Sequence, residues 1–147
     1  MKISTRGRYA LRLMVDLAVN GEEKCIPLRE IADRQQVSDK YLEQIITKLS
    51  KAGLVKSVRG AQGGYVLTRS PQQYTVGMIL RQTEGSLVPV SCVDHPQAGH
   101  CSQEEVCVTQ EVWRKIGEAV SDVVDHITLA ELAEKKKKIL EMQGLKQ

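Results

Sequence analysis

Three cysteines near the middle of the chain are the residues best suited to bind a metal. Cys92, Cys101 and Cys107 are separated by eight and then by five residues. In a reducing compartment, three thiols this close in sequence favour a metal over a disulfide. They suit Zn²⁺ completed by a histidine, or an iron–sulfur cluster with one non-cysteine ligand, and His95 and His100 are near enough to supply that ligand. From the residues alone, zinc and an iron–sulfur cluster remain equal alternatives.

Cys25 stands apart from these three. It lies beside Ile26 in a short apolar segment, where we interpret it as a small, half-buried apolar residue. The alternative is an oxidisable thiol.

A second group of polar residues has the chemistry to contact DNA. On a helix that Ser38 caps, the exposed positions are Ser38, Asp39, Lys40, Glu43, Gln44, Thr47 and Lys48. Glutamine can pair with adenine, lysine reaches guanine or phosphate, and glutamate accepts from the cytosine amino group. A solvated helix has a similar face, so a second signal is needed. Arg59 provides it, because it adjoins a glycine-rich turn that permits close approach to a phosphate backbone and insertion into the minor groove.

The distribution of charge also favours a nucleic-acid partner. The net charge of the chain is +3, but residues 1–70 carry +6, residues 71–134 carry −7 and residues 135–147 carry +4. A basic N-terminal half suits a polyanion, whereas an acidic middle repels one. The lysines at 135–138 are expected at the solvated end of the last helix, where they complement its dipole.

Length and composition exclude several other classes of protein. The 147 residues, 41% hydrophobic and 27% charged, are typical of one globular domain. The apolar runs are too short to cross a bilayer, and Arg12 and Asp16 interrupt the stretch that a secretory signal requires. We therefore expect a cytoplasmic protein with no membrane partner. The chain has no catalytic triad pattern, phosphate-binding loop or Cys-x-x-Cys pair, so we do not expect an enzyme.

Periodicity and capping signals define the elements that position these residues. They predict a helix that follows Ser4–Thr5 and stops at Asn20–Gly21, helices at 29–35, from Ser38 as N-cap to about Lys51 and at 76–83, a long helix from 109, and a final helix that a Thr128–Glu131 capping box starts. Strands at 54–58 and 65–68 flank the glycine-rich turn as a hairpin. Helix, turn, helix and hairpin in this order predict a mainly α protein with a small β-hairpin wing: a winged helix-turn-helix domain followed by a long dimerisation helix.

The long helix carries an apolar stripe suited to pairing with a second copy of the chain. Trp113, Ile116, Val120, Val123 and Ile127 recur three and four residues apart, which is a heptad spacing. We expect this stripe to be a homodimer interface. The predicted organisation is a winged helix-turn-helix domain at 1–84, a cysteine-containing cluster loop at 85–108, and the dimerisation and C-terminal helices at 109–147.

Several segments resemble one family of bacterial regulators. Residues 1–10 (MKISTRGRYA), 41–44 (YLEQ), 57–65 (SVRGAQGGY) and 127–132 (ITLAEL) are similar to the signatures of the IscR/NsrR/CymR-type winged helix-turn-helix transcriptional regulators. The resemblance covers nearly the whole chain. It implies a homodimer on a near-palindromic double-stranded DNA operator, with the position of Arg59 in the minor groove. The full set predicted to contact DNA is Arg6, Arg8, Arg29, Ser38, Asp39, Lys40, Tyr41, Glu43, Gln44, Lys48, Arg59 and Gly60.

The resemblance favours an iron–sulfur cluster, of 2Fe–2S type, over zinc. Cluster-binding members carry three cysteines between the wing and the long helix, commonly with about five residues in each gap, and here the first gap is longer. In some members a histidine after the last cysteine completes the cluster, and in others an N-terminal aspartate of the partner does so. The matching positions here are Gln110 and Arg8. The candidates for the fourth ligand are His100, His95, Glu104, Glu105 and Gln110.

The resemblance leaves two functions open. The first is a regulator whose operator binding is modulated by a cluster on Cys92, Cys101 and Cys107. The alternative is a CymR-like repressor of cysteine metabolism that is controlled by a protein partner, such as a cysteine-biosynthesis enzyme, with its cysteines zinc-bound, redox-active or structural. In that alternative, Cys25 matches a cysteine found in some CymR-like relatives.

Overall fold

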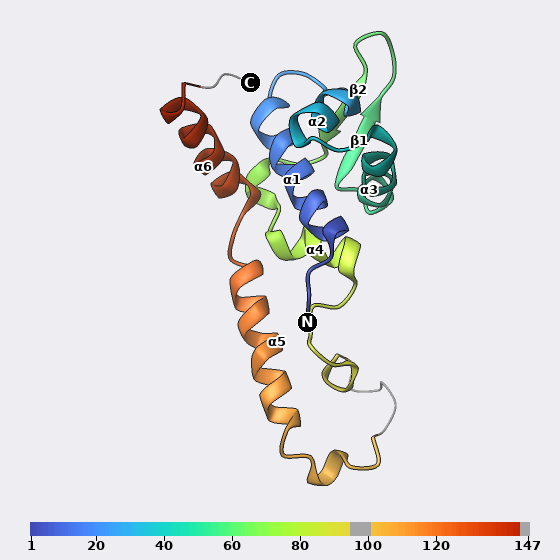
Figure 1. The fold of residues 1–147 in the computed structure, drawn as a ribbon, viewed down its shortest axis with the longest axis vertical. Coiled ribbons are helices and arrows are strands. Elements are labelled where there is room, and N and C mark those ends of the chain that lie inside the picture. The colour runs from blue at the N-terminus through green and yellow to red at the C-terminus, as the bar shows by residue number, and fades with distance from the viewer. Residues whose placement is uncertain (95–100, 145–147) are drawn as a thin grey trace.

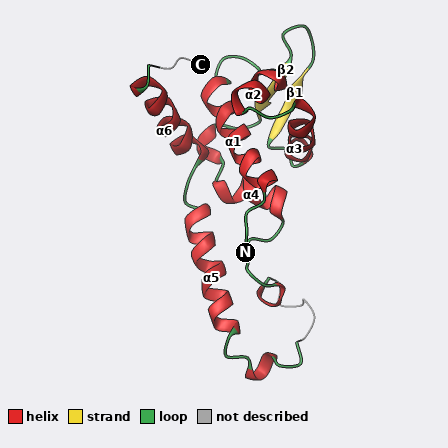
Figure 2. Cartoon of the chain, viewed as in Figure 1, coloured by secondary structure: helices red, strands yellow, loops and turns green. Residues whose placement is uncertain are grey.

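The structure is a computed structural model that describes residues 1–94 and 101–144 (Figure 1). The described part is mainly helical, with one antiparallel hairpin, as the sequence predicts (Figure 2). Its helices and strands are α1 (Thr5–Asn20), α2 (Leu28–Gln35), α3 (Asp39–Lys51), β1 (Val55–Val58), β2 (Gly64–Leu67), α4 (Val76–Glu84), α5 (Gln110–Val124) and α6 (Leu129–Met142). The 3₁₀ turns are η1 (Pro71–Gln73), η2 (Ser91–Val93) and η3 (Glu104–Val106).

Hydroxyl side chains cap the start of four helices. Each accepts a hydrogen bond from the backbone amide three residues later, and the caps are Ser4, Ser38, Thr75 and Thr128. A cap of this kind stabilises a helix by about 1 kcal/mol. Thr128 forms the half of the predicted capping box in which its hydroxyl accepts from the Glu131 amide, at 3.2 Å. Local signals therefore set the starts of these helices.

The main hydrophobic core lies between α1, α2, α3, α4 and the base of the hairpin. Its largest fully buried side chains are Tyr74, Leu13, Met14, Leu17, Ile26, Ile31, Leu42, Ile45, Ile46, Leu49, Ile79 and Leu129. The hydroxyl of Tyr74 donates to the Leu54 carbonyl at 2.7 Å and accepts from the Thr68 amide at 2.9 Å. The buried ring thus keeps its polar end satisfied and ties the end of β2 to the start of β1.

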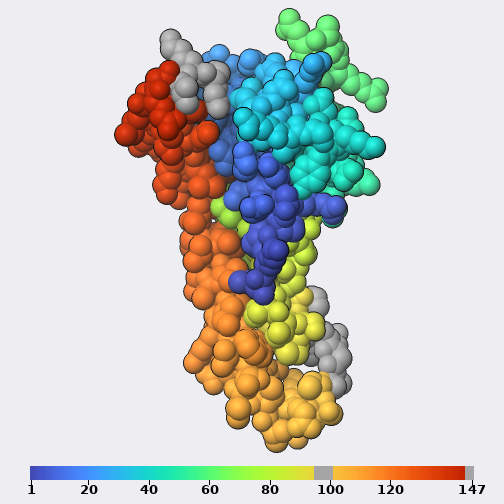
Figure 3. Space-filling model, viewed as in Figure 1, coloured from blue at the N-terminus to red at the C-terminus, as the bar shows by residue number. Residues whose placement is uncertain are grey.

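The hairpin projects from this core. Its strands pair from Val55↔Leu67 to Val58↔Gly64, and Ile26 bridges to Tyr65, which fixes the base of the hairpin against the segment before α2. Gly64 is required there, because a Cβ would come within 2.4 Å of the Ile26 backbone. Beyond this point, the turn projects from the rest of the chain (Figure 3). The predicted wing is therefore anchored to the segment before α2 and carries an exposed turn.

Helix α5 leads away from the core in the opposite direction. The cysteine-containing segment lies at its far end, and the hairpin lies at the other end of the molecule (Figure 1). Residues 85–94 leave the end of α4 on the side away from the hairpin, so the described part of the segment joins α4 at one end and α5 at the other. Coupling between the cysteines and the DNA-contacting elements has these two connections available.

A polar joint connects the C-terminal end of α5 to α4. Arg81 donates to both carboxylate oxygens of Asp125, with one N···O distance of 2.9 Å, and holds the pKa of Asp125 below its ordinary value. Backbone bonds add to the joint, because the Val76 amide donates to the Ile127 carbonyl at 2.9 Å. Gly77 allows this close approach, since a Cβ there would lie 1.9 Å from Asp125 Oδ1. The joint sets the angle between α5 and the helix-turn-helix.

Replacing Gly77 with alanine is expected to destabilise the fold by about 1–2 kcal/mol. The overlap with Asp125 costs about 1–3 kcal/mol, and the better helix propensity of alanine offsets up to about 1 kcal/mol of it. Thermal unfolding at one fixed protein concentration should show a midpoint about 3–8 °C lower. Gly117→Ala is the matched control in α5, because its Cβ meets only a Val88 methyl at 3.1 Å. A Gly77→Ala protein as stable as that control would contradict the tight joint.

Helix α6 continues past the lysines that were expected to end it. It extends to Met142, so Lys135, Lys136, Lys137 and Lys138 lie in its middle and its last turn has no basic residue. The helix is prolonged because Leu140, one turn beyond the lysines, is buried. These lysines therefore do not complement the helix C-terminus. Lys137 instead pairs with Glu22 at 3.1 Å, and Lys138 with Glu134 at 2.9 Å.

Candidate nucleic-acid interface and cysteine segment

The outward face of α3 presents hydrogen-bonding side chains to solvent. Leu42, Ile45, Ile46 and Leu49 point into the core, so the helical period turns the residues between them outward. Lys40, Glu43, Gln44 and Lys48 are accordingly exposed, and Asp39 is exposed in the first turn. The structure thus brings most of the predicted base-contacting set together on one surface.

Three predicted residues on α3 have structural partners of their own. The Ser38 hydroxyl accepts from the Tyr41 amide at 3.2 Å, and the Thr47 hydroxyl donates to the Glu43 carbonyl at 2.6 Å. The ring of Tyr41 is half-buried and meets the ring of Tyr9 edge-on, with 5.7 Å between centroids. Tyr41 therefore packs α3 against α1.

The tip of the hairpin carries Arg59 on an exposed turn. The Gly63 amide donates to the Gly60 carbonyl at 3.0 Å, and Gly60 has a φ of 123°, which other residues rarely adopt. Arg59 itself is exposed. Cys25 supports the turn from below, because its thiol donates to the Gln62 carbonyl at 2.8 Å. Cys25 is half-buried, as the sequence interpretation proposed.

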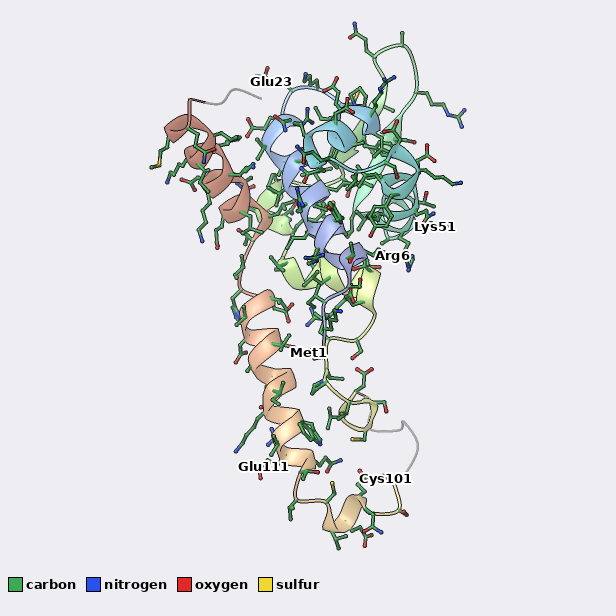
Figure 4. The ribbon with its side chains drawn as sticks, viewed as in Figure 1. Met1, Arg6, Glu23, Lys51, Cys101 and Glu111 are labelled. Atoms are coloured by element: carbon green, nitrogen blue, oxygen red, sulfur yellow. The ribbon has the colours of Figure 1, made fainter. Side chains whose placement is uncertain are left out.

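The remaining arginines of the predicted set are spread over two helices. Arg6 and Arg29 are exposed in the first turns of α1 and α2, and Figure 4 shows Arg6 on the same side of the view as Lys51 at the end of α3. Arg8 points elsewhere, because it lines a groove between α1, α2 and α6. Lys51 and Lys56 are also exposed, although neither belongs to the predicted set. Lys51 lies seven residues after Gln44, about two helical turns along the same face of α3, and this spacing could have identified it.

The cysteine segment offers metal-binding chemistry without a formed site. Cys92 and Cys101 are exposed, and Cys107 is half-buried with its sulfur 3.4 Å from the Thr109 hydroxyl. That hydroxyl lowers the pKa of the Cys107 thiol, which favours the thiolate that metals bind. Figure 4 shows Cys101 at the lower end of the molecule, where Glu111 at the start of α5 also lies. Within residues 1–94 and 101–144, no three ligand side chains are gathered as a metal site.

The candidates for a fourth ligand divide into two groups. His95 and His100 lie outside the described residues. Glu104 and Glu105 are exposed on η3, and Gln110 is half-exposed at the start of α5. The donor types therefore fit a thiolate-bound metal, while the arrangement of the three thiols in the described chain does not assemble one.

The residues of the predicted apolar stripe have two different environments: some pack inside the chain and others face solvent. Val120 and Ile127 pack, with Val124, against Val76, Leu80 and Leu87 in a second core cluster of the same chain. Val123 is 59% exposed and Val112 is 49% exposed. With the half-buried Ile116 and the exposed Ala119 between them, they form an apolar surface strip on α5. The part of α5 available to a partner is therefore this strip, defined as Val112, Ile116, Ala119 and Val123.

In the part of the chain that the structure describes, no helix is long and apolar enough to cross a membrane.

Comparisons with known proteins agree with this arrangement. Residues 3–135 match the family model Rrf2, described as an iron-dependent transcriptional regulator. The chain is 41% identical over 132 residues to the HTH-type transcriptional regulator IscR of Aliivibrio salmonicida, covering 90% of this chain and 77% of that one. It superimposes on the structure of CymR, the global cysteine regulator of B. subtilis, with a TM-score of 0.75 and 41% identity. This match covers 92% of this chain and 98% of that one. The chain superimposes on the structure of T. potens IscR with a TM-score of 0.77 and 42% identity, covering 95% of this chain and 90% of that one. The predicted winged helix-turn-helix fold is confirmed.

Proposed function

The chain belongs to the Rrf2 family of transcriptional regulators, and on this premise we propose that it binds a specific double-stranded DNA operator as a homodimer in the bacterial cytoplasm. The observation that carries the proposal is the exposed polar face of α3 beside a projecting hairpin with Arg59 near its tip. The protein is a DNA-binding regulator and not an enzyme.

Each exposed side chain of α3 has a chemical counterpart in the major groove. Gln44 can donate and accept at once, which suits the N6 and N7 edge of adenine. Lys40 suits guanine acceptors or a phosphate, and Glu43 accepts from the cytosine amino group. Arg6, Arg29 and Lys48 would hold the phosphate backbone, and Arg59 would enter the minor groove beside the site. The Ser38 hydroxyl caps α3, so we propose that Ser38 positions the helix on the DNA. Asp39 and Gly60 would lie at the edges of the contact.

Dimerisation would place two such surfaces on one operator. The apolar strip on α5 is solvent-exposed in the single chain, and pairing two copies of it would remove this surface from water. A twofold dimer contacts two half-sites one helical turn apart or a multiple of it, so the operator would be near-palindromic. Trp113 is half-buried on the same helix and would adjoin this contact.

The regulatory signal is proposed to act through the cysteine segment. Thiolates of Cys92, Cys101 and Cys107 would hold an iron–sulfur cluster of 2Fe–2S type, which would supply a redox- and iron-sensitive state at the far end of α5. The family description as iron-dependent and the lowered pKa of Cys107 support this. The fourth ligand would come from His95, His100, Glu104, Glu105 or Gln110. Anaerobic purification followed by absorption spectroscopy tests the cluster, because a zinc or metal-free protein has no visible band.

A second candidate is control by a protein partner. It is favoured by the exposed, ungathered thiols in the described chain and by the likeness to CymR. In that case the protein would be a repressor of cysteine metabolism whose operator binding depends on a cysteine-biosynthesis enzyme, with its cysteines zinc-bound, redox-active or structural. A colourless protein that gains operator affinity only with such an enzyme would support this candidate.

The operator itself can be obtained by selection from a random duplex pool. Selected sequences are expected to converge on two inverted half-sites and to bind about 10³-fold or more tightly than random duplex. Affinity should fall steeply as salt rises, because phosphate contacts release counterions. A pool that never converges would contradict sequence-specific binding.

Replacing all three cysteines of the cysteine segment with alanine is expected to change operator affinity by about 5- to 150-fold, the usual range of an allosteric coupling. The fold should survive, because none of the three thiols belongs to either core cluster. Operator titration of the reconstituted protein and the variant checks the change, and thermal unfolding checks the fold. A folded triple variant that binds every operator as the wild type does would show that these cysteines do not regulate operator binding.

A further inference from the structure

A groove between α1, α2 and α6 is separate from the surfaces that the proposed function uses. It has a volume of about 460 Å³ and is bounded by α1 on one side and by the middle of α6 on the other. In Figure 1, α1 lies between α6 and α3. None of its lining residues belongs to α3, the hairpin or α5. Its size is within the range of small-molecule sites.

The floor of the groove is apolar. It is formed by Leu11, Val15 and Val19 of α1 and by Leu132 and Ile139 of α6. Ile139 is 49% exposed, although it lies within a helix that packs on α1. An apolar molecule laid along this floor would cover surface that the described chain leaves in contact with water.

The rim of the groove is positively charged. Arg8 and Arg12 stand on the α1 side, and Lys135 and Lys136 on the α6 side. Among the residues that the structure describes, none of these four cations has a carboxylate within salt-bridge distance. Arg12 is held in place, because its Nε donates to Gln35 Oε1 at 2.7 Å and its guanidinium lies 4.9 Å from the centre of the Tyr9 ring. Cations on opposite walls, one of them held in place, suit a single anionic group between them.

The carboxylate at the end of the groove does not oppose an anion. Asp16 is buried and receives two hydrogen bonds from Arg34, at 2.6 and 3.0 Å, and one from Gln35 at 3.1 Å. Its charge is therefore matched inside the protein by Arg34. Among the described residues, the four rim cations remain as the charge of the groove that no carboxylate pairs with.

We propose that this groove binds an amphiphilic anion, a molecule with one carboxylate or phosphate head on an unbranched apolar chain of about ten carbons. The chain would lie on the valine and leucine floor, and the head would lie between the arginines of α1 and the lysines of α6. Such a molecule would join α6 to α1 and thereby act on the unit that carries α3. A DNA backbone fits the groove less well, because the apolar floor offers a phosphate no hydrogen-bond donor.

Decanoate is the probe for the site, and decyltrimethylammonium, which has the same chain and the opposite charge, is its control. Calorimetric titration of the full-length protein is expected to show one decanoate per chain, bound at least tenfold more tightly than the cation, which corresponds to about 1.4 kcal/mol. Methyl NMR shifts should fall on Val15, Leu132 and Ile139. Equal binding of both probes, or shifts confined to the apolar strip on α5, would overturn the proposal.

Lys135→Gln combined with Lys136→Gln tests the charged rim. This double variant is expected to lose at least fivefold in decanoate affinity, while its binding of decyltrimethylammonium is not weakened, because the substitutions remove repulsion of a cation. Lys138→Gln is the matched control, because Lys138 is exposed on the same helix, pairs with Glu134 and does not line the groove. Unchanged decanoate binding by the double variant, or displacement of decanoate by a random 30-base-pair duplex, would overturn the site.

Discussion

Replacing Val123 with glutamate is expected to turn the dimer into monomers and to weaken operator binding about a thousandfold. Val123 is 59% exposed in the single chain, so the substitution leaves the monomer's own packing intact. In the dimer it would place a charge within the apolar strip on α5 of both copies, and an unpaired charge in an apolar contact is strongly unfavourable. A monomer reaches only one half-site, which removes a large share of the binding free energy of a typical nanomolar complex.

Sedimentation velocity and operator titration measure the two effects of this substitution. Val108→Glu is the control, because Val108 is 87% exposed just before α5 and lies outside the strip. Val120→Glu makes the opposite comparison, since Val120 packs in the second core cluster and its variant should lose stability as well as association. A Val123→Glu protein that still sediments as a dimer at micromolar concentration would show that α5 is not the interface.

The sequence was sufficient to predict an element wherever its structure depends on residues that are neighbours along the chain. Ser38 and Thr75 are followed by apolar residues at helical spacing, and both helices begin where these caps predict. The glycine-rich turn between two short β-rich runs likewise gave the hairpin within a residue or two. Caps, turns and periodicity act over three or four residues, so a single sequence contains them in full.

Periodicity alone could not predict which apolar residues of α5 are buried and which are exposed. Val123 and Val124 are adjacent, and a three-four spacing from Val120 accommodates either of them. Which one turns inward depends on the angle between α4 and α5, and that angle is set by the Arg81–Asp125 pair across 44 residues of sequence. The structure places Val124 in the cluster and leaves Val123 exposed.

The candidate sites differ in how far the sequence could define them. The face of α3 followed from one helix, so Lys40, Glu43 and Gln44 were identified correctly as exposed. Arg6 and Arg8 were grouped together, yet two residues apart on a helix they point in different directions, and Arg8 lies in the groove with α6. The separation of the three thiols depends on a loop without periodicity, and no local rule predicts it.

Replacing Arg59 with alanine is expected to weaken operator binding by about 100-fold. Each dimer would lose two minor-groove contacts, and an arginine contact of this kind contributes about 1–3 kcal/mol. The fold should be unaffected, because Arg59 is exposed beyond the paired part of the hairpin. Operator titration at several salt concentrations measures the loss, and the slope of log affinity against log salt should fall by about one for each phosphate contact removed.

Two further variants separate the charge of Arg59 from its shape. Arg59→Lys retains the charge, so it should preserve most of the salt dependence while losing part of the affinity, because an ammonium lacks the planar, weakly hydrated guanidinium that suits a narrow groove. Lys138→Ala removes a cation from α6, on the opposite side of α1 from α3 (Figure 1), and should leave operator binding within about twofold of wild type, since a distant exposed charge is largely screened. If Arg59→Ala instead titrates the operator like Lys138→Ala, the hairpin does not contact DNA, and specificity must come from α3 alone.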